Sequence, residues 1–525
     1  MFFEQITTPG LGCFSYAIGC PLAGLMAVVD PRRDIDVYLR LAAENGMRIT
    51  QVFETHVHAD HVSGGRELAR ATGADVYLHE SAPVGYAAKK LKEGDEFKFG
   101  YAALRVLHTP GHTPNSISLV VTDLARSPQP QMVLTGDLLF VGDIGRPDLP
   151  GADILEEQVA NLYHSLYVKL AGLPDYLEVY PAHGAGSLCG SGMSAKPYST
   201  LGYERLANPM LKYANQEDFR SAVLANLPMR PQSFSGIIAA NLHGPALLDE
   251  LDGRGENSGR SGQPAVTAAP GQPAVDAGPG QPVASGRPAA DAASGQPVAS
   301  GQPAASGQPA GPGQPAALEP DGPALSPAQT EELIASGALL LDLRDALAFG
   351  SAHIPGSVNV DFSNGPELNW AGMAVPPNTP LVLVLPADQS FGLARTELRR
   401  IGYDAVQGWL KGGLSAWINS GRETLGFSYM SAPVLKKSMD GPDAPILLDV
   451  RAPAEFDTAH IEGAAHLAFD QLVALDECPI APDADVVVIC RSGFRAAIAA
   501  SLLENKGCRH LTILAGGMNA WGNAQ

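Results

Sequence analysis

The sequence predicts a multidomain α/β protein, and three observations lead to this fold class. First, 525 residues exceed what one hydrophobic core supports, and such a length predicts roughly three to four domains. Second, a stretch rich in Gly, Pro, Ala, Ser and Gln separates two parts whose apolar runs are typical of folded domains. Third, the C-terminal part contains one pattern of strands and helices twice.

Composition and charge exclude several classes of partner. Hydrophobic residues make up 45% of the chain, and no apolar run approaches the ~18 residues that span a membrane. The net charge of −20 argues against nucleic acid or an anionic membrane as a partner. The N-terminus, MFFEQITTPG, lacks the basic region of a signal peptide, so we expect a cytoplasmic protein. The oligomeric state stays open, and a homo-oligomer is compatible with the sequence.

The central stretch, residues 253–323, repeats the unit GQPA and contains no aromatic residue. It buries too little apolar surface to offset chain entropy, and its prolines interrupt helices and strand ladders. We therefore expect a disordered tether. The expected organisation is a domain at 1–252, the tether at 253–323, and two domains at 324–425 and 426–525.

Short apolar runs predict strands in the N-terminal domain, mostly separated by turns or helix-like stretches. They are Leu25–Val29, Ile49–Phe53, Asp75–Leu78, Leu104–His108, Ile117–Val121 and Met132–Thr135. Polar residues of catalytic type directly follow several of these runs. Strand ends are common places for metal sites, so these polar residues are candidate ligands.

The strongest motif is THVHADH at residues 55–61, directly after a predicted strand. A hydrophobic core disfavours such a run, because each unpaired buried polar group costs a few kcal/mol. His112, Asp137 and His183 follow later in the chain, each next to a glycine. The joint pattern predicts a metal site.

These residues resemble the HxHxDH signature of the metallo-β-lactamase superfamily, over about residues 1–240. The resemblance implies an N-terminal αββα sandwich. Hydrolases of the glyoxalase II type use two metal ions that activate a bridging water, whereas persulfide dioxygenases bind one iron(II). Carried over, the iron ligands are His56, His112 and Asp137, a triad that leaves open positions for substrate sulfur and O₂. His58, Asp60, His61 and His183 would bind no metal and would instead surround the ligands and orient them.

Two features favour the dioxygenase, since both subfamilies contain all these ligands. Residues 135–148 resemble the loop after the aspartate ligand in persulfide dioxygenases, where Arg146 would pair with a substrate carboxylate. A structural pair between Arg146 and Asp148 is about equally compatible with the sequence. The second feature is the fusion to a sulfur-transfer module, described below.

The loop after His183 departs from the glutathione-dependent members, which usually have a Tyr shortly after the last histidine. Here the sequence is HGAGSLCG, which argues against glutathione as the thiol carrier. It also predicts that Cys189 lies near the iron and contacts or transiently carries sulfane sulfur. Cys20 is a weaker candidate, and we expect Cys20, Cys478 and Cys508 to be inert, since six scattered cysteines do not form a disulfide framework.

The duplicated pattern begins with LLLDLR at 339–344 and ILLDVR at 446–451, about 105 residues apart. It predicts βα units and a mainly parallel sheet in each copy. In the second copy CRSGFR (490–495) lies between a predicted strand and a predicted helix. Such a loop directs backbone N–H groups inward at a helix N-terminus, so it favours a Cys490 thiolate, with Arg491 and Arg495 adding positive charge.

The loop at Cys490 resembles the rhodanese active loop, and the resemblance covers both copies. It implies a sulfurtransferase that forms a covalent persulfide on Cys490. In the first copy Leu385 stands at the cysteine position, so that copy is expected to be catalytically silent. The Asp–Arg pairs, Asp342 with Arg344 and Asp449 with Arg451, recur in both copies and are expected to be structural.

Together these features predict an iron(II) enzyme that oxidises low-molecular-weight persulfides or polysulfides with O₂ to sulfite. Its rhodanese would interconvert persulfide and thiosulfate. Two alternatives stay open: a dinuclear zinc thioester hydrolase of the glyoxalase II type, and a rhodanese pair that serves chiefly to bind sulfur or dock a partner.

Overall fold

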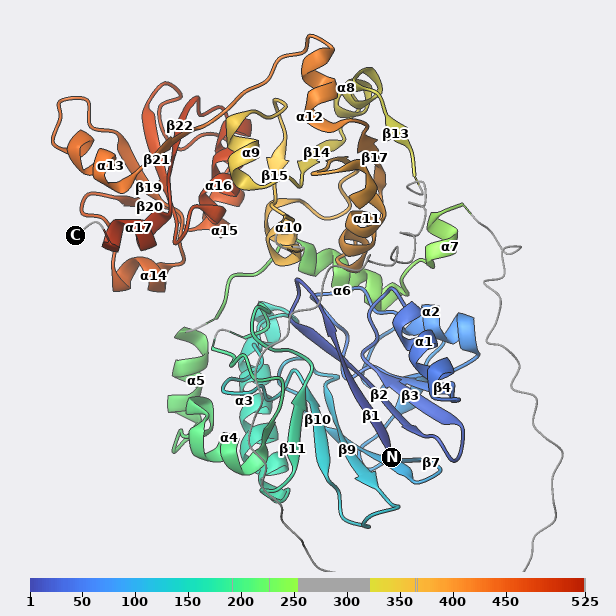
Figure 1. Cartoon of the computed structure of the whole chain (residues 1–525). Helices are drawn as coiled ribbons and strands as arrows, with labels where there is room; N and C mark the ends of the chain where they lie inside the picture. The colour runs from blue at the N-terminus through green and yellow to red at the C-terminus, as the bar shows by residue number, and fades with distance from the viewer. Residues whose placement is uncertain (191, 226, 254–321, 364, 366, 524–525) are drawn as a thin grey trace, which may run out of the picture. The chain divides into compact units, whose positions relative to one another are not determined.

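The computed structural model describes residues 1–190, 192–225, 227–253, 322–363, 365 and 367–523 (Figure 1). The predicted tether at 253–323 lies outside the described residues except at its two ends. Among the described residues, no helix combines the length and the apolar character needed to cross a membrane.

Two six-stranded sheets form the centre of the N-terminal domain, in the orders β1-β2-β3-β4-β5-β6 and β12-β11-β10-β9-β8-β7. The first sheet consists of β1 Phe2–Thr8, β2 Cys13–Cys20, β3 Leu25–Val29, β4 Arg48–Phe53, β5 Asp75–His79 and β6 Lys89–Leu91. The second consists of β7 Glu96–Phe99, β8 Ala102–His108, β9 Ile117–Asp123, β10 Met132–Gly136, β11 Glu178–Pro181 and β12 Ser199–Thr200. All six predicted strands are confirmed, with ends that differ by at most two residues.

Strand β3 shows how the sheets divide the core. Met26 and Val28 pack on the helix side, whereas Ala27 and Val29 pack between the two sheets. This alternation follows from the period of two in a strand, and a run that is apolar on both faces needs cover on both.

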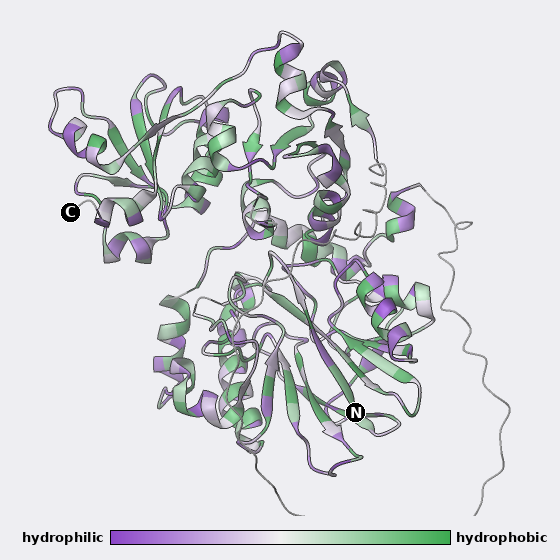
Figure 2. Cartoon of the chain, in the orientation of Figure 1, coloured by the Kyte–Doolittle hydropathy of each residue, from purple (hydrophilic) through white to green (hydrophobic). Residues whose placement is uncertain are grey.

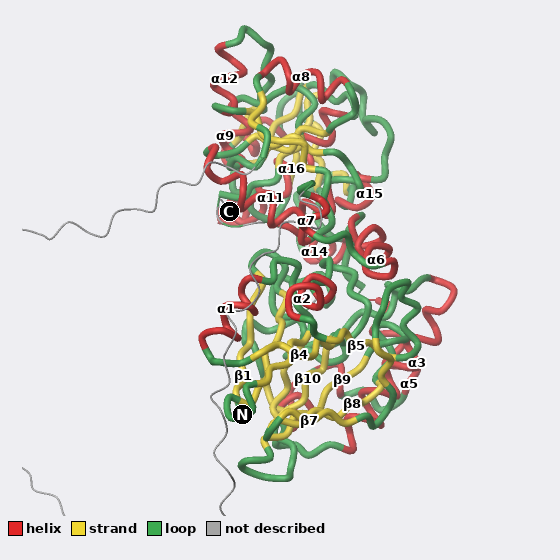
Figure 3. The backbone as a smooth tube through the Cα atoms, turned by 90° about the vertical axis from the view of Figure 1, so that its right-hand side faces the viewer, coloured by secondary structure: helices red, strands yellow, loops and turns green. Residues whose placement is uncertain are grey.

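Helices cover the outer face of each sheet, as Figures 1 and 3 show. The first sheet packs against α1 Asp36–Glu44 and α2 Gly65–Thr72. The second packs against α3 Leu155–His164, α4 Leu201–Ala207 and α5 Gln216–Ala225. Then follow α6 Ser233–His243 and α7 Leu248–Leu251. The predicted αββα sandwich is confirmed.

The two C-terminal domains have five-stranded parallel sheets of the same strand order, which confirms the duplication. The first sheet has β13 Ala324–Leu325, β17 Val406–Leu410, β16 Leu381–Val384, β14 Leu339–Asp342 and β15 Val358–Asn359. The second has β18 Ser428–Met430, β22 His510–Leu514, β21 Asp485–Ile489, β19 Ile446–Asp449 and β20 Ala465–His466. Figure 2 shows hydrophobic residues concentrated on these strands.

Helices flank both parallel sheets. The first domain has α8 Pro327–Ala335, α9 Ala346–Ser351, α10 Leu368–Ala374, α11 Phe391–Arg400 and α12 Gly413–Asn419. The second has α13 Ala432–Met439, α14 Pro453–Thr458, α15 Phe469–Val473, α16 Phe494–Asn505 and α17 Gly517–Asn523. The predicted helix after Cys490 is therefore α16.

One expectation about cysteines is wrong. Cys478 and Cys508 form a disulfide, with Cα atoms 5.5 Å apart. The backbone N–H of Cys478 donates to the Lys506 carbonyl at 2.9 Å, so the loop before β21 lies against the end of α16. The two cysteines are 30 residues apart in the chain, so local sequence patterns do not predict that they meet. Cys20 is buried, as expected.

Candidate metal centre and sulfur-transfer loop

Three buried side chains converge where strands of the two central sheets end. His56 follows β4, His112 lies between β8 and β9, and Asp137 directly follows β10. Asp137 Oδ2 is 3.4 Å from His112 Nε2 and 3.9 Å from His56 Nε2. The sequence predicted this triad, and the fold brings its members together.

The three facing atoms have no hydrogen-bond partner among the described residues: His56 Nε2, His112 Nε2 and Asp137 Oδ2. Buried polar atoms are normally satisfied, because an unsatisfied one costs about 1–3 kcal/mol. A metal ion about 2 Å from each would satisfy all three at once, and two imidazoles with one carboxylate suit a divalent metal. The donor set therefore fits a metal ion.

A second atom of each ligand fixes its orientation. His112 Nδ1 is 2.7 Å from the Arg146 carbonyl oxygen, and His56 Nδ1 is 3.0 Å from Thr55 Oγ1. Asp137 Oδ1 is 2.6 Å from His183 Nδ1. Such outer contacts set the ring tautomer and direct the free atom inward.

The remaining motif residues form hydrogen bonds behind the triad, in two separate groups. His183 Nε2 is 2.8 Å from Asp60 Oδ2, and Asp60 Oδ1 is 3.2 Å from His61 Nδ1. His58 Nε2 lies 3.1 Å from carboxylates of both Asp30 and Glu54. His58 Nδ1 has no partner among the described residues, so it is a further candidate ligand atom.

Burial and charge set the protonation of these groups. Burial lowers the pKa of His56 and of His112, which keeps both imidazoles neutral. Burial raises the pKa of Asp137, but His183 and other neighbours together lower it by more, so the net pKa lies below its ordinary range. Neutral imidazole and ionised carboxylate are the forms that bind a metal.

Several residues at this centre carry no signal in the sequence motif. The Cys13 thiol donates to Asp60 Oδ2 at 2.9 Å. Asn241, on α6, donates to the carbonyls of His58 and His61 at 2.9 Å each. Asp30, which directly follows β3, and Glu54, which directly follows β4, do obey the strand-end rule that located the triad.

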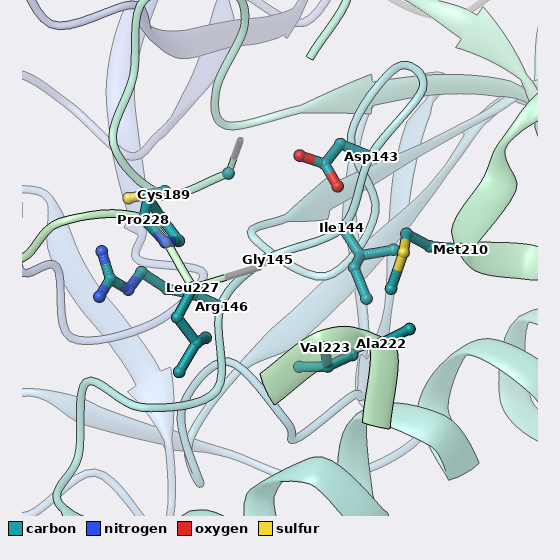
Figure 4. Close-up of a pocket in the computed structure, with 11 residues that line it drawn as sticks. Asp143, Ile144, Gly145, Arg146, Cys189, Met210, Ala222, Val223, Leu227 and Pro228 are labelled. Atoms are coloured by element: carbon teal, nitrogen blue, oxygen red, sulfur yellow. The ribbon is translucent and has the colours of Figure 1, made fainter. Parts of the chain in front are cut away.

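Cys189 lies beside the metal centre, where the sequence predicted it. Its thiol belongs to a compact group with Asp137 and His183, all within 4.8 Å of one another. Burial raises the pKa of Cys189 to about 12, which keeps the thiol protonated. A cavity of about 40 Å³ adjoins it, with Cys189 and Arg146 on one side and Asp143 and Met210 on the other (Figure 4).

The Arg146 guanidinium is buried and already occupied. Its Nε and Nη2 donate to the two Asp148 oxygens at 2.6 and 2.7 Å. Its Nη1 donates to the carbonyls of Leu188 and Met229 at 3.2 and 3.0 Å. The structural pair with Asp148 is therefore present, and a substrate carboxylate would have to compete with it.

The sulfur-transfer candidate Cys490 directly follows β21, at the N-terminal end of α16. The Gly493 N–H donates to Cys490 Sγ at 3.0 Å, as expected for a loop whose amides point inward. Gly493 has φ +99°, a conformation that glycine adopts without strain. The Arg495 guanidinium pairs with both Glu455 oxygens, at 2.6 and 2.8 Å.

A cavity of about 560 Å³ adjoins this loop, and Arg491 and Glu455 are among its lining residues. Cys490 itself is buried. The cavity reaches Arg491 of the loop, and Cys490 is not among the residues that line it. The catalytic roles of Cys490, Arg491 and Arg495 stay predictions.

The first copy has no cysteine at the equivalent place. Asp342 pairs with Val384 in the first sheet as Asp449 pairs with Ile489 in the second, so Leu385 corresponds to Cys490. Both Asp–Arg motifs form bidentate ion pairs in which the aspartate is buried, as expected for a structural pair.

Comparison with family models places three domains on the chain. Residues 19–183 match the metallo-beta-lactamase superfamily, and residues 326–420 and 431–524 match the rhodanese-like domain.

Individual relatives extend these matches. The human protein named "Persulfide dioxygenase ETHE1, mitochondrial" is 28% identical over 258 residues, 46% of this chain and 88% of that protein. A hydroxyacylglutathione hydrolase of Polaromonas sp. is 36% identical over 173 residues, 32% of this chain and 61% of that protein. The crystal structure of a metallo-beta-lactamase from Staphylococcus aureus subsp. aureus COL is 27% identical, with a TM-score of 0.58, and covers 78% of this chain and 98% of its own.

Proposed function

We propose that the chain, a member of the metallo-β-lactamase superfamily with two rhodanese-like domains, oxidises low-molecular-weight persulfides and transfers their sulfane sulfur. Its N-terminal domain is homologous to persulfide dioxygenases, and the rhodanese-like domains are the two C-terminal ones. The observation that carries this proposal is the convergence, beside the Cys189 thiol, of three ligand atoms that have no hydrogen-bond partner among the described residues. The domain boundaries at 252, 323 and 425 are part of the same proposal.

The N-terminal site would hold one iron(II) ion through His56, His112 and Asp137. When bound, the iron supplies the redox chemistry that lets O₂ react with a sulfur anion. The chain's own contribution is to orient the ligands and exclude water. Asp137, for example, is fixed through Oδ1 by His183, which leaves Oδ2 directed into the centre.

Cys189 is proposed to contact the persulfide sulfur. Its protonated thiol, buried beside His183, suits a hydrogen-bond donor to a sulfur anion. Overall, the persulfide R–S–SH, O₂ and water would give the thiol R–SH and sulfite. Both oxygen atoms of O₂ go to the terminal sulfur, and water supplies the third oxygen of sulfite. The terminal sulfur is oxidised while O₂ is reduced.

Cys490 is proposed to carry sulfane sulfur in the C-terminal domain. Its thiolate attacks the outer sulfur of thiosulfate, the S–S bond breaks, and sulfite leaves with the electron pair. The reverse step moves the outer sulfur of the Cys490 persulfide onto sulfite and makes thiosulfate. Because both sites lie in one chain, sulfite formed at the first is produced near the second.

Oxygen uptake by iron-loaded protein with a panel of persulfides tests the first activity. We expect uptake with at least one persulfide and one iron per chain in the active preparation. No uptake with any persulfide would end the dioxygenase proposal. For the second activity, Cys490→Ser should abolish sulfur transfer from thiosulfate to cyanide, and retention of the transfer would remove Cys490 from the mechanism.

Replacing Cys189 by Ala tests its contact with substrate. We expect kcat/KM for the persulfide to fall about tenfold or more, with the iron content unchanged. The matched control is Cys20→Ala, which removes a buried thiol from β2 and should leave turnover intact. Unchanged turnover in Cys189→Ala would show that Cys189 has no role in the reaction.

A dinuclear zinc hydrolase is the second candidate. The Polaromonas relative is named a hydroxyacylglutathione hydrolase, and here His58, Asp60 and His61 form a buried group that could hold a second ion. Metal analysis separates the candidates, because two zinc ions per active chain with thioester hydrolysis would replace the dioxygenase proposal.

A further inference from the structure

Helix α10 of the silent rhodanese copy contacts both candidate active-site loops through two adjacent residues. Asn369 faces the loop that carries Cys189, and Trp370 faces the loop that carries Cys490. This copy has Leu385 where a nucleophile would stand, so its own chemistry does not explain why it is retained between two reactive domains.

The first contact is a hydrogen bond to the Cys189 loop. Asn369 Nδ2 donates to the Gly186 carbonyl oxygen at 2.7 Å. Gly186 has φ +101°, so this turn has a backbone conformation that few residues adopt. Within the same turn, the Ser187 hydroxyl accepts the Cys189 N–H at 3.1 Å. The bond from Asn369 therefore acts three residues from the thiol.

The second contact is an aromatic surface under the Cys490 loop. The Trp370 ring lies edge to face with Phe494, with centroids 6.3 Å apart, and Arg495 Cζ is 5.9 Å from its centroid. Phe469 of α15 packs on the same ring at 5.2 Å. Phe494 and Arg495 form the first turn of α16, whose N-terminal end carries Cys490.

A third path links α10 to the metal ligands through α6. The Gln232 side chain donates to the Met373 carbonyl at 2.9 Å, and a Cβ at Gly372 would overlap the Ser233 hydroxyl. Helix α6 in turn carries Asn241, which hydrogen-bonds the backbone of the histidine motif. Close packing of α10 on α6 thus supports the loop at residues 58–61.

We propose that the silent rhodanese copy is a positioning domain, in which Asn369 and Trp370 on α10 fix the geometry of the Cys189 and Cys490 loops. Asn369 and Trp370 are positioning residues, since neither touches a reacting atom. The chemistry of the loops rests on the proposed function. The positioning itself can be measured without substrate.

The test is the rate at which iodoacetamide alkylates each free cysteine of the metal-free full-length chain, followed by peptide mass spectrometry. Asn369→Asp keeps the shape but replaces the amide donor, so Cys189 alkylation should accelerate at least about threefold while Cys490 alkylation is unchanged. Trp370→Ala should do the opposite, accelerating Cys490 at least about threefold and leaving Cys189 unchanged. Trp370→Phe retains an aromatic ring and should stay close to the parent rate.

Cys20, in β2, is the internal reference because it lies in a different part of the N-terminal domain. Loop-specific acceleration with a constant Cys20 rate supports positioning. Equal alkylation rates in the parent and the variants would overturn the positioning proposal, because the contacts would then have no effect on the loops. Parallel acceleration at every cysteine, including Cys20, would also overturn it, because the contacts would then only stabilise the fold. Absence of oxygen uptake in the parent would refute the proposed dioxygenase activity and would leave the alkylation result interpretable.

Discussion

At the scale of the residue, the metal centre depends on side chains that direct one polar atom toward the metal position and hydrogen-bond the protein through another. Asp137 shows this most clearly, since one oxygen bonds His183 and the other has no hydrogen-bond partner in the part of the chain that the structure describes. His183 uses both ring nitrogens on carboxylates, of Asp137 and Asp60. Burial lowers the pKa of His183, but Asp137 and other neighbours raise it well above its ordinary value.

Removal of the His183 ring should therefore weaken metal binding, although all three proposed direct ligands remain. We expect His183→Ala to raise the metal dissociation constant about 10- to 100-fold, measured by competition with a chelator. His243→Ala, at an exposed histidine that ends α6, is the control. If the parent binds two metal ions and His183→Ala loses one of them while it binds the other as tightly as before, His183 is a ligand of a second ion.

At the scale of the element, the two rhodanese copies show what a reactive loop needs beyond a strand and a helix. The second copy places the Gly493 amide 3.0 Å from Cys490 Sγ and an arginine on the first turn of α16. By position, Asp388 and Ser390 of the first copy correspond to Gly493 and Arg495. The Asp388 carboxylate accepts the Gly412 N–H at 3.1 Å, so an acidic side chain takes the place of the glycine amide of the active loop.

A cysteine alone should not restore the silent copy. We expect Leu385→Cys, made together with Cys490→Ser, to show no sulfur transfer from thiosulfate to cyanide, because Asp388 and Ser390 stand where the active loop has the glycine and the arginine that support a thiolate. The parent chain is the positive control. Transfer above the Cys490→Ser background would mean that the strand–helix frame suffices.

The Glu455–Arg495 pair predicts a pH dependence for the active loop. The hydrogen bond from Arg495 lowers the pKa of Glu455 below its ordinary value of 4.5. Its folded pKa lies below its unfolded pKa, so the stabilisation is full above about pH 4.5 and is lost as pH falls through the folded value. The side chain is 33% exposed, so we expect under about 1 kcal/mol.

Glu455→Gln should remove that pH-dependent part. Chemical denaturation at pH 7 and at pH 4 should show a smaller difference in unfolding free energy for the variant than for the parent. Thiosulfate:cyanide transfer should also fall, because Arg495 loses the partner that orients it. Identical pH dependence in both proteins would contradict the coupling.

At the scale of the whole molecule, contacts between domains join distant parts of the chain. The Val62 N–H, next to the histidine motif, donates to the Arg400 carbonyl of α11 at 2.7 Å. The Arg400 guanidinium pairs with Asp34 at 2.7 and 2.8 Å. The silent copy is thus part of the surroundings of the metal loop as well as a neighbour of Cys490.

The disulfide between Cys478 and Cys508 closes a chain separation of 30 residues that includes β21 and α16. Loop-closure entropy suggests that it contributes about 3–4 kcal/mol to the second rhodanese domain. Reduction by dithiothreitol should lower the melting temperature of that domain. Cys508→Ala should lower it equally and be insensitive to the reductant, and a reductant effect in that variant would point to another cause.

The sequence predicted the parallel sheets of the two C-terminal domains, the strands that precede His56, His112 and Asp137, and the absence of a cysteine from the active-loop position of the first rhodanese copy, and its resemblance to the metallo-β-lactamase superfamily implied the αββα sandwich. These features depend on local patterns, since a strand period or a motif of seven residues does not need distant partners. It failed at Cys478 and Cys508 and had no signal for Cys13 or Asn241. Only tertiary packing decides which atoms of residues more than a hundred positions apart, such as Asn241 and His58, meet in one hydrogen bond.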